Sequence, residues 1–210
     1  MGKTIYLIRH GETELNKTGI VQGRGIDSDL NDTGRAQAEA FYQRYKNVPF
    51  DNIYISTLKR TQQTVQTFIE TGIPWQKLSG LDELAWGEWE GKTSTTESLL
   101  LFRNLLEKWQ SRDYDAKFNG GESPKEVATR LLAAMEVIMS NKGEKVILIC
   151  MHGRAMRLLL CLLTQKPICA MVTFPHKNTS LYKLSFNNNK FSIKDFNKTD
   201  HLKVKLSCQK

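Results

Sequence analysis

Cysteine is scarce in this sequence, and no hydrophobic run is long. The four cysteines have no Cys-x-x-Cys spacing, so they predict neither a structural zinc site nor a disulfide framework; they are Cys150, Cys161, Cys169 and Cys208. The longest apolar stretch, MRLLLCLL, is far shorter than the roughly 20 residues that a membrane-spanning helix needs. The opening MGKTIYLIRHGE runs from an apolar stretch into charge, which is not the pattern of a signal peptide. We therefore expect a cytoplasmic protein with reduced cysteines and no membrane partner.

Several familiar catalytic motifs are also missing. The sequence contains no glycine-rich P-loop, no His-Glu-x-x-His motif and no cysteine-based phosphatase loop of the Cys-x5-Arg type. Any nucleophile must therefore be sought among other residues.

Acidic residues are outnumbered, with 22 Asp and Glu against 30 Lys and Arg, and the formal net charge is +8. This charge suits anionic partners. Many of the lysines crowd into the last 21 residues: Lys190, Lys194, Lys198, Lys203, Lys205 and Lys210. A nucleic-acid surface would interleave aromatic residues with them along a groove, and only Phe191 and Phe196 do so. We therefore expect a solvated, partly frayed tail and no nucleic-acid partner.

The hydrophobic content, 40% of 210 residues, is enough for one sizeable core. Uninterrupted apolar runs predict buried strands, and apolar positions at helical spacing predict helices. Strands are expected over residues 3–9, 50–56 and 144–153, helices over 31–47, 57–72, 96–113, 123–143 and 154–165, and a hairpin over 180–196. Alternating strands and helices indicate an α/β fold, a three-layer sandwich with a mostly parallel central sheet flanked by helices. A small helical cap and the C-terminal β-hairpin complete the expected architecture.

Two predicted strands that lie far apart in the sequence end in a His-Gly pair, His10-Gly11 and His152-Gly153. In sheets of this kind ligands bind beyond the carboxyl ends of the strands, and both pairs are expected at that edge. An Arg-His turn alone is more often structural than catalytic, so the prediction of a site depends on the repeated pair.

Arginines are expected at the same edge. Arg9 directly precedes His10, and the helix that follows Ser56 carries Arg60 back toward the edge. Two guanidinium groups can clamp a tetrahedral oxyanion through their planar donors. Together with the amide of Asn16, the arginines and histidines predict a phosphate site. The acid that protonates a leaving oxygen is expected in the loop LDELAWGEWEG, whose four carboxylates the composition does not separate.

These residues stand in a series of motifs that resembles the histidine phosphatase superfamily, in the branch that contains cofactor-dependent phosphoglycerate mutases and broad-specificity phosphatases. The motifs follow the family's order from about Ile5 to Ser180: RHGETELN, VQGRGIDSDLNDTGRAQA, STLKRTQQT, LDELAWGEWEG, GGES, CMHGRAMRLLL and NTSL. Each motif alone is modest, but the ordered set is highly specific.

The resemblance implies a role for each residue of the site. His10 would be the nucleophile that becomes phosphohistidine, and Glu83 would protonate the departing alcohol and then activate water. The groups that would hold the phosphoryl oxygens are Arg9, Arg60 and His152, assisted by Asn16 and the amide of Gly153. Neither a metal nor a cofactor is implied, because arginines supply the positive charge.

Some assignments stay open at the level of sequence. Glu12 and Glu14 lie near the nucleophile and are alternatives to Glu83. Gln22 and Gly23 are candidates for substrate binding, although Gln22 is equally suited to tying its own turn. Other residues are expected to be structural: Glu88 and Glu90 as loop braces, Trp86 and Trp89 as packing anchors, and His176 and His201 as surface or loop residues.

The segment between the Glu83 loop and the Gly-Glu-Ser motif bears on the activity. Mutases of this family carry an insertion there that grips phosphoglycerate, whereas residues 91–120 of this chain are mostly one helix. We therefore predict a single domain over residues 1–210 with a small cap insertion around residues 84–120. The predicted activity is metal-independent hydrolysis of a phosphomonoester, a small phosphorylated metabolite that the sequence does not identify. A phosphoglycerate mutase and a catalytically silent phospho-ligand binder remain alternatives.

Overall fold

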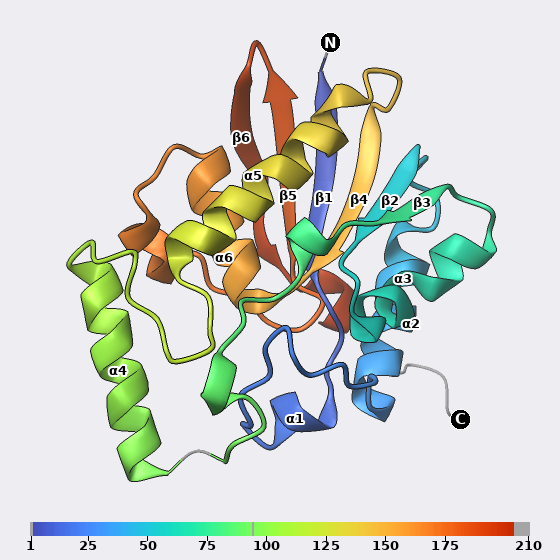
Figure 1. Ribbon diagram of the computed structural model, residues 1–210. Coiled ribbons are helices and arrows are strands. Elements are labelled where there is room, and N and C mark those ends of the chain that lie inside the picture. The colour runs from blue at the N-terminus through green and yellow to red at the C-terminus, as the bar shows by residue number, and fades with distance from the viewer. Residues whose placement is uncertain (1, 94, 204–210) are drawn as a thin grey trace.

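The computed structural model describes residues 2–93 and 95–203 of the chain. Its centre is a six-stranded sheet with the strand order β3-β2-β4-β1-β5-β6 (Figure 1). The strands are β1 (Lys3–Arg9), β2 (Asn52–Ile55), β3 (Trp75–Lys77), β4 (Val146–Met151), β5 (Leu181–Asn187) and β6 (Lys190–Lys198). The first four strands are parallel, and the β5–β6 hairpin joins β1 in antiparallel pairing. The predicted mostly parallel sheet and the C-terminal hairpin are confirmed.

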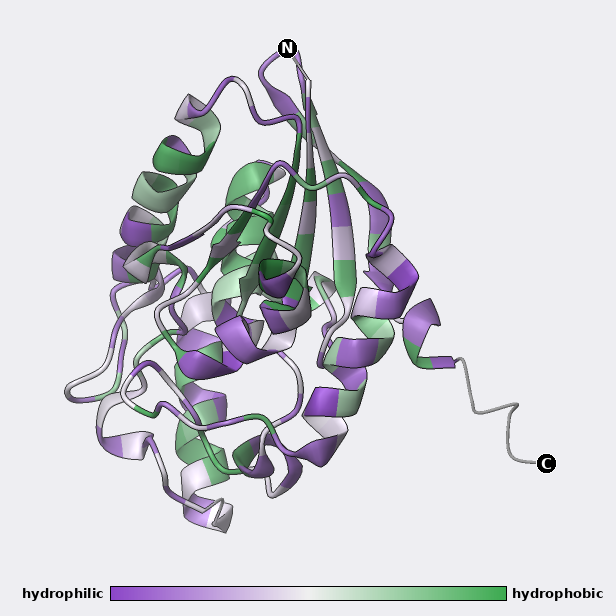
Figure 2. Cartoon of the chain, turned by 90° about the vertical axis from the view of Figure 1, so that its right-hand side faces the viewer, coloured by the Kyte–Doolittle hydropathy of each residue, from purple (hydrophilic) through white to green (hydrophobic). Residues whose placement is uncertain are grey.

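Helices cover both faces of the sheet, as the predicted three-layer sandwich requires. The helices are α2 (Asp32–Tyr45) and α3 (Lys59–Glu70) on one face, and α5 (Pro124–Ser140) and α6 (Gly153–Leu163) on the other (Figure 1). Successive side chains of β1 enter two different cores: Leu7 packs with α5 and α6, and Ile8 with α2 and α3. In Figure 2 the strands are largely hydrophobic, and the outer helical surfaces carry most of the hydrophilic colour.

Local sequence signals explain where the helices begin. At the start of α5, Ser123 Oγ accepts the Glu126 N–H at 3.3 Å and the Glu126 carboxylate accepts the Ser123 N–H at 2.8 Å, with Pro124 in the first turn. The same reciprocal pairing of Thr95 with Ser98 opens α4 (Thr96–Gln110). Both helices therefore start within one residue of the position predicted from the sequence.

The sequence did not predict β3. Trp75, Gln76 and Lys77 are all exposed, so they carry neither the apolar run nor the alternation that marks a strand. The strand forms because its backbone pairs with the edge of β2, for example Trp75 with Ile53. A strand that forms only by backbone pairing at the edge of a sheet has no hydrophobic pattern from which the sequence could predict it.

Residues 84–121 run from the second half of the Glu83 loop to the motif that opens α5, and they contain the turn η2 (Gly87–Trp89) and helix α4. An isolated bridge pairs Trp86 with Gly121 at the base of this segment, which we call the cap. Trp86 also stacks on Trp109 of α4, with ring centroids 5.9 Å apart. α4 lies at one side of the molecule, away from the sheet (Figure 1). The remaining short elements are α1 (Glu14–Lys17), η1 (Ser79–Leu81), η3 (Ile168–Thr173) and η4 (Asp200–Lys203).

The basic C-terminal segment is only partly as predicted. Lys190 and Lys194 are exposed residues of the predicted hairpin, and Lys198 extends β6 beyond it, so these three lysines belong to an ordered strand and not to a frayed tail. The lysines beyond residue 203 and Cys208 lie outside the described residues. Within the part of the chain that the structure describes, no helix has the length and apolar character to cross a membrane.

Two glycines bring the loop after β1 against the start of α2. A Cβ atom placed on Gly34 would lie 2.0 Å from the Glu12 carbonyl oxygen, and one on Gly11 would lie 2.6 Å from the Gly34 carbonyl oxygen. Both obstacles are backbone atoms, which cannot swing away as a flexible side chain can. The loop that carries His10 is therefore positioned by direct backbone contact with α2.

We expect Gly34→Ala to destabilise the fold, although alanine is the better helix former. Overpacking of this kind typically costs about 1–3 kcal/mol, which outweighs the roughly 1 kcal/mol that alanine gains in a helix. Urea unfolding measures the change. The matched control is Gly143→Ala, where no atom lies within 4 Å of the added carbon, and its stability should change by less than about 0.5 kcal/mol. Equal stability of the two variants would show that the loop and α2 can move apart freely.

Candidate active site

The pairing of β1 with β4 brings the two His-Gly pairs together. Arg9 is the register partner of Met151, and the His10 N–H donates to the Met151 carbonyl at 2.9 Å. The rings of His10 and His152 follow directly, with centroids 5.1 Å apart. Both side chains are buried, at 2% and 0% exposure. The carboxyl ends of the two central strands thus place two imidazoles side by side.

The hydrogen bonds of His10 fix its tautomer. Its Nδ1 lies 2.7 Å from the Gly11 carbonyl oxygen, which can only accept, so Nδ1 carries the proton and Nε2 keeps its lone pair. Burial lowers the pKa of His10 well below its usual value, and the charges of Arg9 and Arg60 lower it further. The neutral imidazole with a free Nε2 is the form of histidine that can attack an electrophile.

Arg60 and His152 form a second buried unit. Arg60 Nε donates to His152 Nδ1 at 3.2 Å, so His152 Nε2 carries the proton and donates to Ser56 Oγ at 2.8 Å. The two terminal nitrogens of Arg60 donate to the carbonyls of Ile26 at 2.7 Å and Gly23 at 3.2 Å. Burial lowers the pKa of Arg60 to about 10, and the charge of a nearby carboxylate, Glu83, opposes this shift. The guanidinium is held rigidly by acceptors that carry no charge.

Gly23 therefore contacts Arg60 through its carbonyl. A larger residue does not fit at Gly23, because a Cβ atom there would lie 2.7 Å from the Leu84 carbonyl oxygen. The other loop candidate, Gln22, accepts hydrogen bonds from Thr13 Oγ1 at 3.1 Å and Ser28 Oγ at 2.6 Å. These contacts favour the interpretation of Gln22 as a tie of its own loop. Asn16 accepts from Asn178 Nδ2 at 3.1 Å, which joins two loops at the site.

Arg9 completes the cluster of cations. Its Nη1 donates to Nδ1 of His176 at 3.1 Å, and its buried Nε has no hydrogen-bond partner within residues 2–93 and 95–203. Burial lowers the pKa of Arg9 to about 10, opposed by the charge of Glu83 and assisted by that of Arg60. A buried donor that is left unsatisfied costs free energy unless a ligand accepts from it.

His176 belongs to the site, which the sequence did not predict. It does lie in a loop, between η3 and β5, but its ring contacts Arg9 and covers the start of α6, where a Cβ on Gly153 would lie 2.6 Å from it. Burial and the positive charges of Arg9 and Arg157 lower the pKa of His176 to about 3, so it is neutral at physiological pH. Its position two residues before Asn178 of the NTSL motif was the available signal.

The expectation of a surface or loop position is wrong for His201. This side chain is 2% exposed within η4, packs edge-on against Phe41 and shares a 3.0 Å hydrogen bond with Thr179 Oγ1. It is a core histidine.

Glu83 is buried at the N-terminus of α6. Its carboxylate accepts three backbone N–H groups, from Leu84 at 2.9 Å, Ala155 at 2.9 Å and Arg154 at 3.0 Å. The positive end of the helix dipole favours a carboxylate at this position. Glu83 is thus anchored to the first turn of α6, directly after His152 and Gly153 in the chain.

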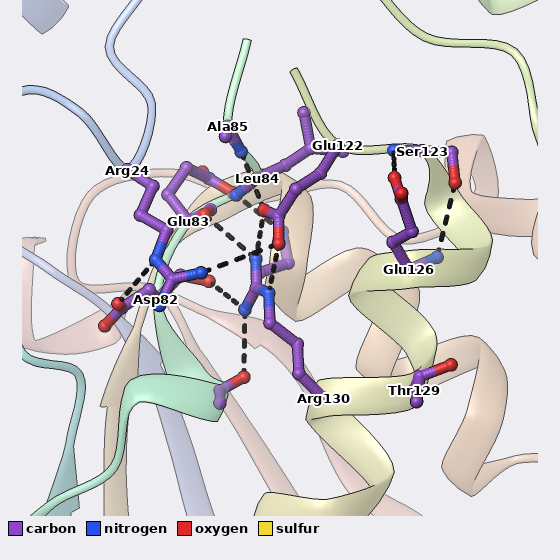
Figure 3. A network of polar contacts seen from close by, with 12 residues as sticks. Arg24, Asp82, Glu83, Leu84, Ala85, Glu122, Ser123, Glu126, Thr129 and Arg130 are labelled. Atoms are coloured by element: carbon purple, nitrogen blue, oxygen red, sulfur yellow. Dashed lines mark hydrogen bonds and ion pairs between the residues drawn. The ribbon is translucent and has the colours of Figure 1, made fainter. Parts of the chain in front are cut away.

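A network around Arg130 fixes the backbone on both sides of Glu83 (Figure 3). Arg130 Nη1 donates to the carbonyls of Gly80 and Asp82 at 2.9 and 2.8 Å, and Nη2 donates to the Glu83 carbonyl at 3.0 Å. Arg130 also pairs with the carboxylate of Glu122, at 2.8 Å from Nε to Oε1. Arg130 was not among the site residues predicted from the sequence. The signal was an arginine on the otherwise apolar face of the helix 123–143, because a charge there needs buried partners.

The remaining carboxylates are engaged elsewhere. Glu12 accepts from Asn31 Nδ2 at 2.9 Å, and the exposed Glu14 faces Lys17 at 3.8 Å. Glu90 accepts the Trp86 N–H at 2.9 Å, which confirms its predicted bracing of the loop. The exposed Glu88 and the packing residues Trp86 and Trp89 lie in that loop as well. No group of three or more His, Cys, Asp or Glu side chains in the described ranges is arranged to hold a metal ion.

The model of the histidine phosphatase superfamily (branch 1) matches residues 5–199. A probable phosphatase of Schizosaccharomyces pombe is 32% identical over 160 residues, 74% of this chain and 70% of its own. A putative phosphoserine phosphatase of Hydrogenobacter thermophilus is 27% identical over 200 residues, covering 95% of this chain and 97% of its own. Among solved structures, YhfR of Bacillus stearothermophilus superimposes with a TM-score of 0.82 at 27% identity, over 95% of this chain and 99% of that one.

The match spans nearly the whole chain, with all of β2 to β6 and most of β1. The relatives found by sequence are named as phosphatases, and the structural neighbour shares the sandwich fold. The protein is therefore an enzyme of the phosphomonoesterase type, and the chain belongs to the histidine phosphatase superfamily, branch 1.

Proposed function

We propose that the protein hydrolyses a small phosphorylated metabolite, without a metal, through a phosphohistidine formed on His10. One observation carries the proposal: the buried His10 has its Nδ1 proton bound by the Gly11 carbonyl, and its Nε2 is free among three cationic or donor side chains. These side chains are Arg9, Arg60 and His152. The unpartnered Nε of Arg9 fits a phosphoryl oxygen as its missing acceptor.

In the first step Nε2 of His10 attacks phosphorus in line with the ester oxygen. A P–N bond forms as the P–O bond breaks, and the alcohol leaves with a proton from Glu83. The guanidinium groups stabilise the charge spread over the three equatorial oxygens. In the second step water attacks phosphorus, gives a proton to Glu83 and displaces His10 Nε2, which releases inorganic phosphate. Asn16 and the N–H of Gly153 are proposed as further donors to the phosphoryl oxygens.

The proposed acid must carry a proton when the ester is cleaved, and its carboxylate is held in place by three backbone N–H donors. His152 and Arg60 hold fixed positions for this step, because both are tied to acceptors within the protein.

The small cap supports hydrolysis over a mutase reaction, in which the phosphohistidine must be shielded from water until it returns its phosphoryl group. The relatives named as phosphatases, including a phosphoserine phosphatase, support the same choice. The presence of every required group weighs against a catalytically silent binder.

His10→Ala should abolish the nucleophile and leave the surrounding sheet folded. We expect turnover of p-nitrophenyl phosphate to fall more than about 100-fold, or about 2.7 kcal/mol in the barrier. Acid-labile phosphate should no longer appear on the protein after quenching with acid. Circular dichroism and the melting temperature check that the variant folds. Turnover within about tenfold of the unmodified enzyme would reject His10 as the nucleophile.

Removal of divalent metals should not change the activity, because the positive charge of the site comes from side chains. The measurement is the rate after dialysis against excess EDTA, with and without added Mg²⁺, Mn²⁺ or Zn²⁺. A rate that collapses on chelation and returns with one ion would contradict a metal-independent reaction.

Glu83→Gln should slow substrates according to how basic their leaving groups are. An alkoxide must be protonated as it leaves, whereas p-nitrophenolate leaves unaided, and general acid catalysis typically contributes about 10²–10⁴-fold. The amide also loses part of the anchor at α6, so the informative quantity is the ratio of the two rates in one variant. Burst and steady-state kinetics on glycerol phosphate and p-nitrophenyl phosphate give this ratio.

Equal losses on both esters would transfer the acid role to Glu12 or Glu14. The same experiment follows isomerisation of phosphoglycerate by the unmodified enzyme. Isomerisation faster than phosphate release would replace the phosphatase with a mutase.

A further inference from the structure

Arg154, the second residue of α6, lies beside the proposed acid and has no assigned role. Its backbone N–H donates to Glu83 at 3.0 Å, which fixes its Cα next to that carboxylate. Its guanidinium carbon lies 5.6 Å from the ring centroid of Trp86 and 5.9 Å from that of Trp109. The cation therefore rests against two stacked indoles, one from the Glu83 loop and one from the cap helix α4.

The guanidinium of Arg154 has no polar partner. It makes no hydrogen bond and lies within 4 Å of no carboxylate in the part of the chain that the structure describes. Arg24, Arg103 and Arg130, by contrast, each pair with a carboxylate. Burial lowers the pKa of Arg154 to about 10, yet the group stays charged at physiological pH. The charged guanidinium of Arg154 is thus held by contact with aromatic rings, and its N–H donors are available to an acceptor.

A second arginine increases the need for an anion here. Arg157 lies one helical turn after Arg154 and donates through Nε to the Phe174 carbonyl at 2.8 Å. It too has no ion-pair partner within the described residues. The charge of Glu83 acts on both arginines, but its oxygens already accept three N–H groups. Like charges one turn apart repel, and an oxyanion between them removes that repulsion.

The position of Arg154 relative to the proposed acid indicates which part of a substrate it can bind. The scissile phosphate is expected at His10, and Glu83 is expected at the leaving oxygen. Arg154 lies next to Glu83, and its guanidinium rests against one indole of the Glu83 loop and one of α4, so we expect it beside the alcohol part of the substrate. A substrate whose only anionic group is the phosphate at His10 does not need the guanidinium of Arg154.

We propose that Arg154 binds a second anionic group of the substrate, a carboxylate or a second phosphate on the leaving alcohol. The inference deepens the proposed function and rests on it. Arg157 provides a second positive charge next to the same anion. The proposed substrate class is therefore a phosphomonoester whose alcohol carries its own negative charge.

The test compares substrates that differ by one anionic group. One pair is 3-phosphoglycerate and glycerol 3-phosphate, which differ by a carboxylate. The other is fructose 1,6-bisphosphate and fructose 6-phosphate, which differ by a phosphate. For each pair, the ratio of kcat/KM values measures the contribution of the second anion, and it is insensitive to the amount of folded protein.

Arg154→Met keeps an unbranched stem against the indoles and removes the charge. We expect it to lower at least one of the two ratios about tenfold or more, mainly through KM. Arg154→Lys keeps a point charge and should restore part of the ratio. Arg103→Met, on the exposed face of α4 and paired only with Glu107, is the matched control and should leave both ratios as they are. The pair whose ratio falls identifies carboxylate or phosphate as the second anion.

Both ratios unchanged in Arg154→Met would overturn the inference. Calorimetric binding of the same four esters to His10→Ala separates it from the proposed function, since binding needs no turnover. The unmodified enzyme failing to turn over any ester would reject the catalytic proposal. The anion subsite would still stand if adding Arg154→Met to His10→Ala weakens binding of the doubly anionic member of a pair.

Discussion

The hydrogen bond from the His10 N–H to the Met151 carbonyl is the contact on which the site depends. It extends the β1–β4 ladder by one residue past the end of β1, so both strands deliver their histidines at the same level. The parallel pairing of adjacent strands makes this possible, because their carboxyl ends share one edge. A register shift of one residue would send His10 to the opposite face of the sheet. The backbone pairing of β1 with β4 therefore determines where the two histidines lie relative to each other.

The site around this contact is built from charges that the protein does not neutralise. Arg60 is held by carbonyls and by His152, Arg9 by His176, and Arg154 by two indoles. Such neutral partners fix the direction of each guanidinium without cancelling its charge. The neighbouring histidines remain uncharged, because protonation in this buried, positive environment is unfavourable. An anionic ligand is the partner that the arrangement lacks.

The acid side of the site is organised in the opposite way. Glu83 is surrounded by N–H donors and by the Arg130 network, which binds the carbonyls of Gly80, Asp82 and Glu83. The loop contains little regular structure, so these contacts from α5 hold its backbone in place. A fixed backbone matters at this position because proton transfer needs heavy atoms within hydrogen-bond distance.

The sequence was sufficient for the fold and for the residues at strand ends. The apolar runs before His10 and His152 and the capping residues of α5 are local signals, and the elements they predict were confirmed. The sequence failed where long-range contact decides. β3 consists of exposed residues that pair only through backbone, and His176 and Arg130 become part of the site only when distant segments fold against it. His201 looked like a surface residue, and packing against Phe41 buried it.

The exposed lysines of β6 have a consequence for the molecule as a whole. Among the described residues β6 is an outer strand of the sheet, and no further strand pairs with its outer edge there, so another strand could join it. Lys190, Lys194 and Lys198 lie on the exposed positions of that strand, so a second copy approaching edge to edge would meet a row of like charges. The charges of these three lysines thereby disfavour edge-to-edge pairing of two copies, and this effect requires no anionic partner.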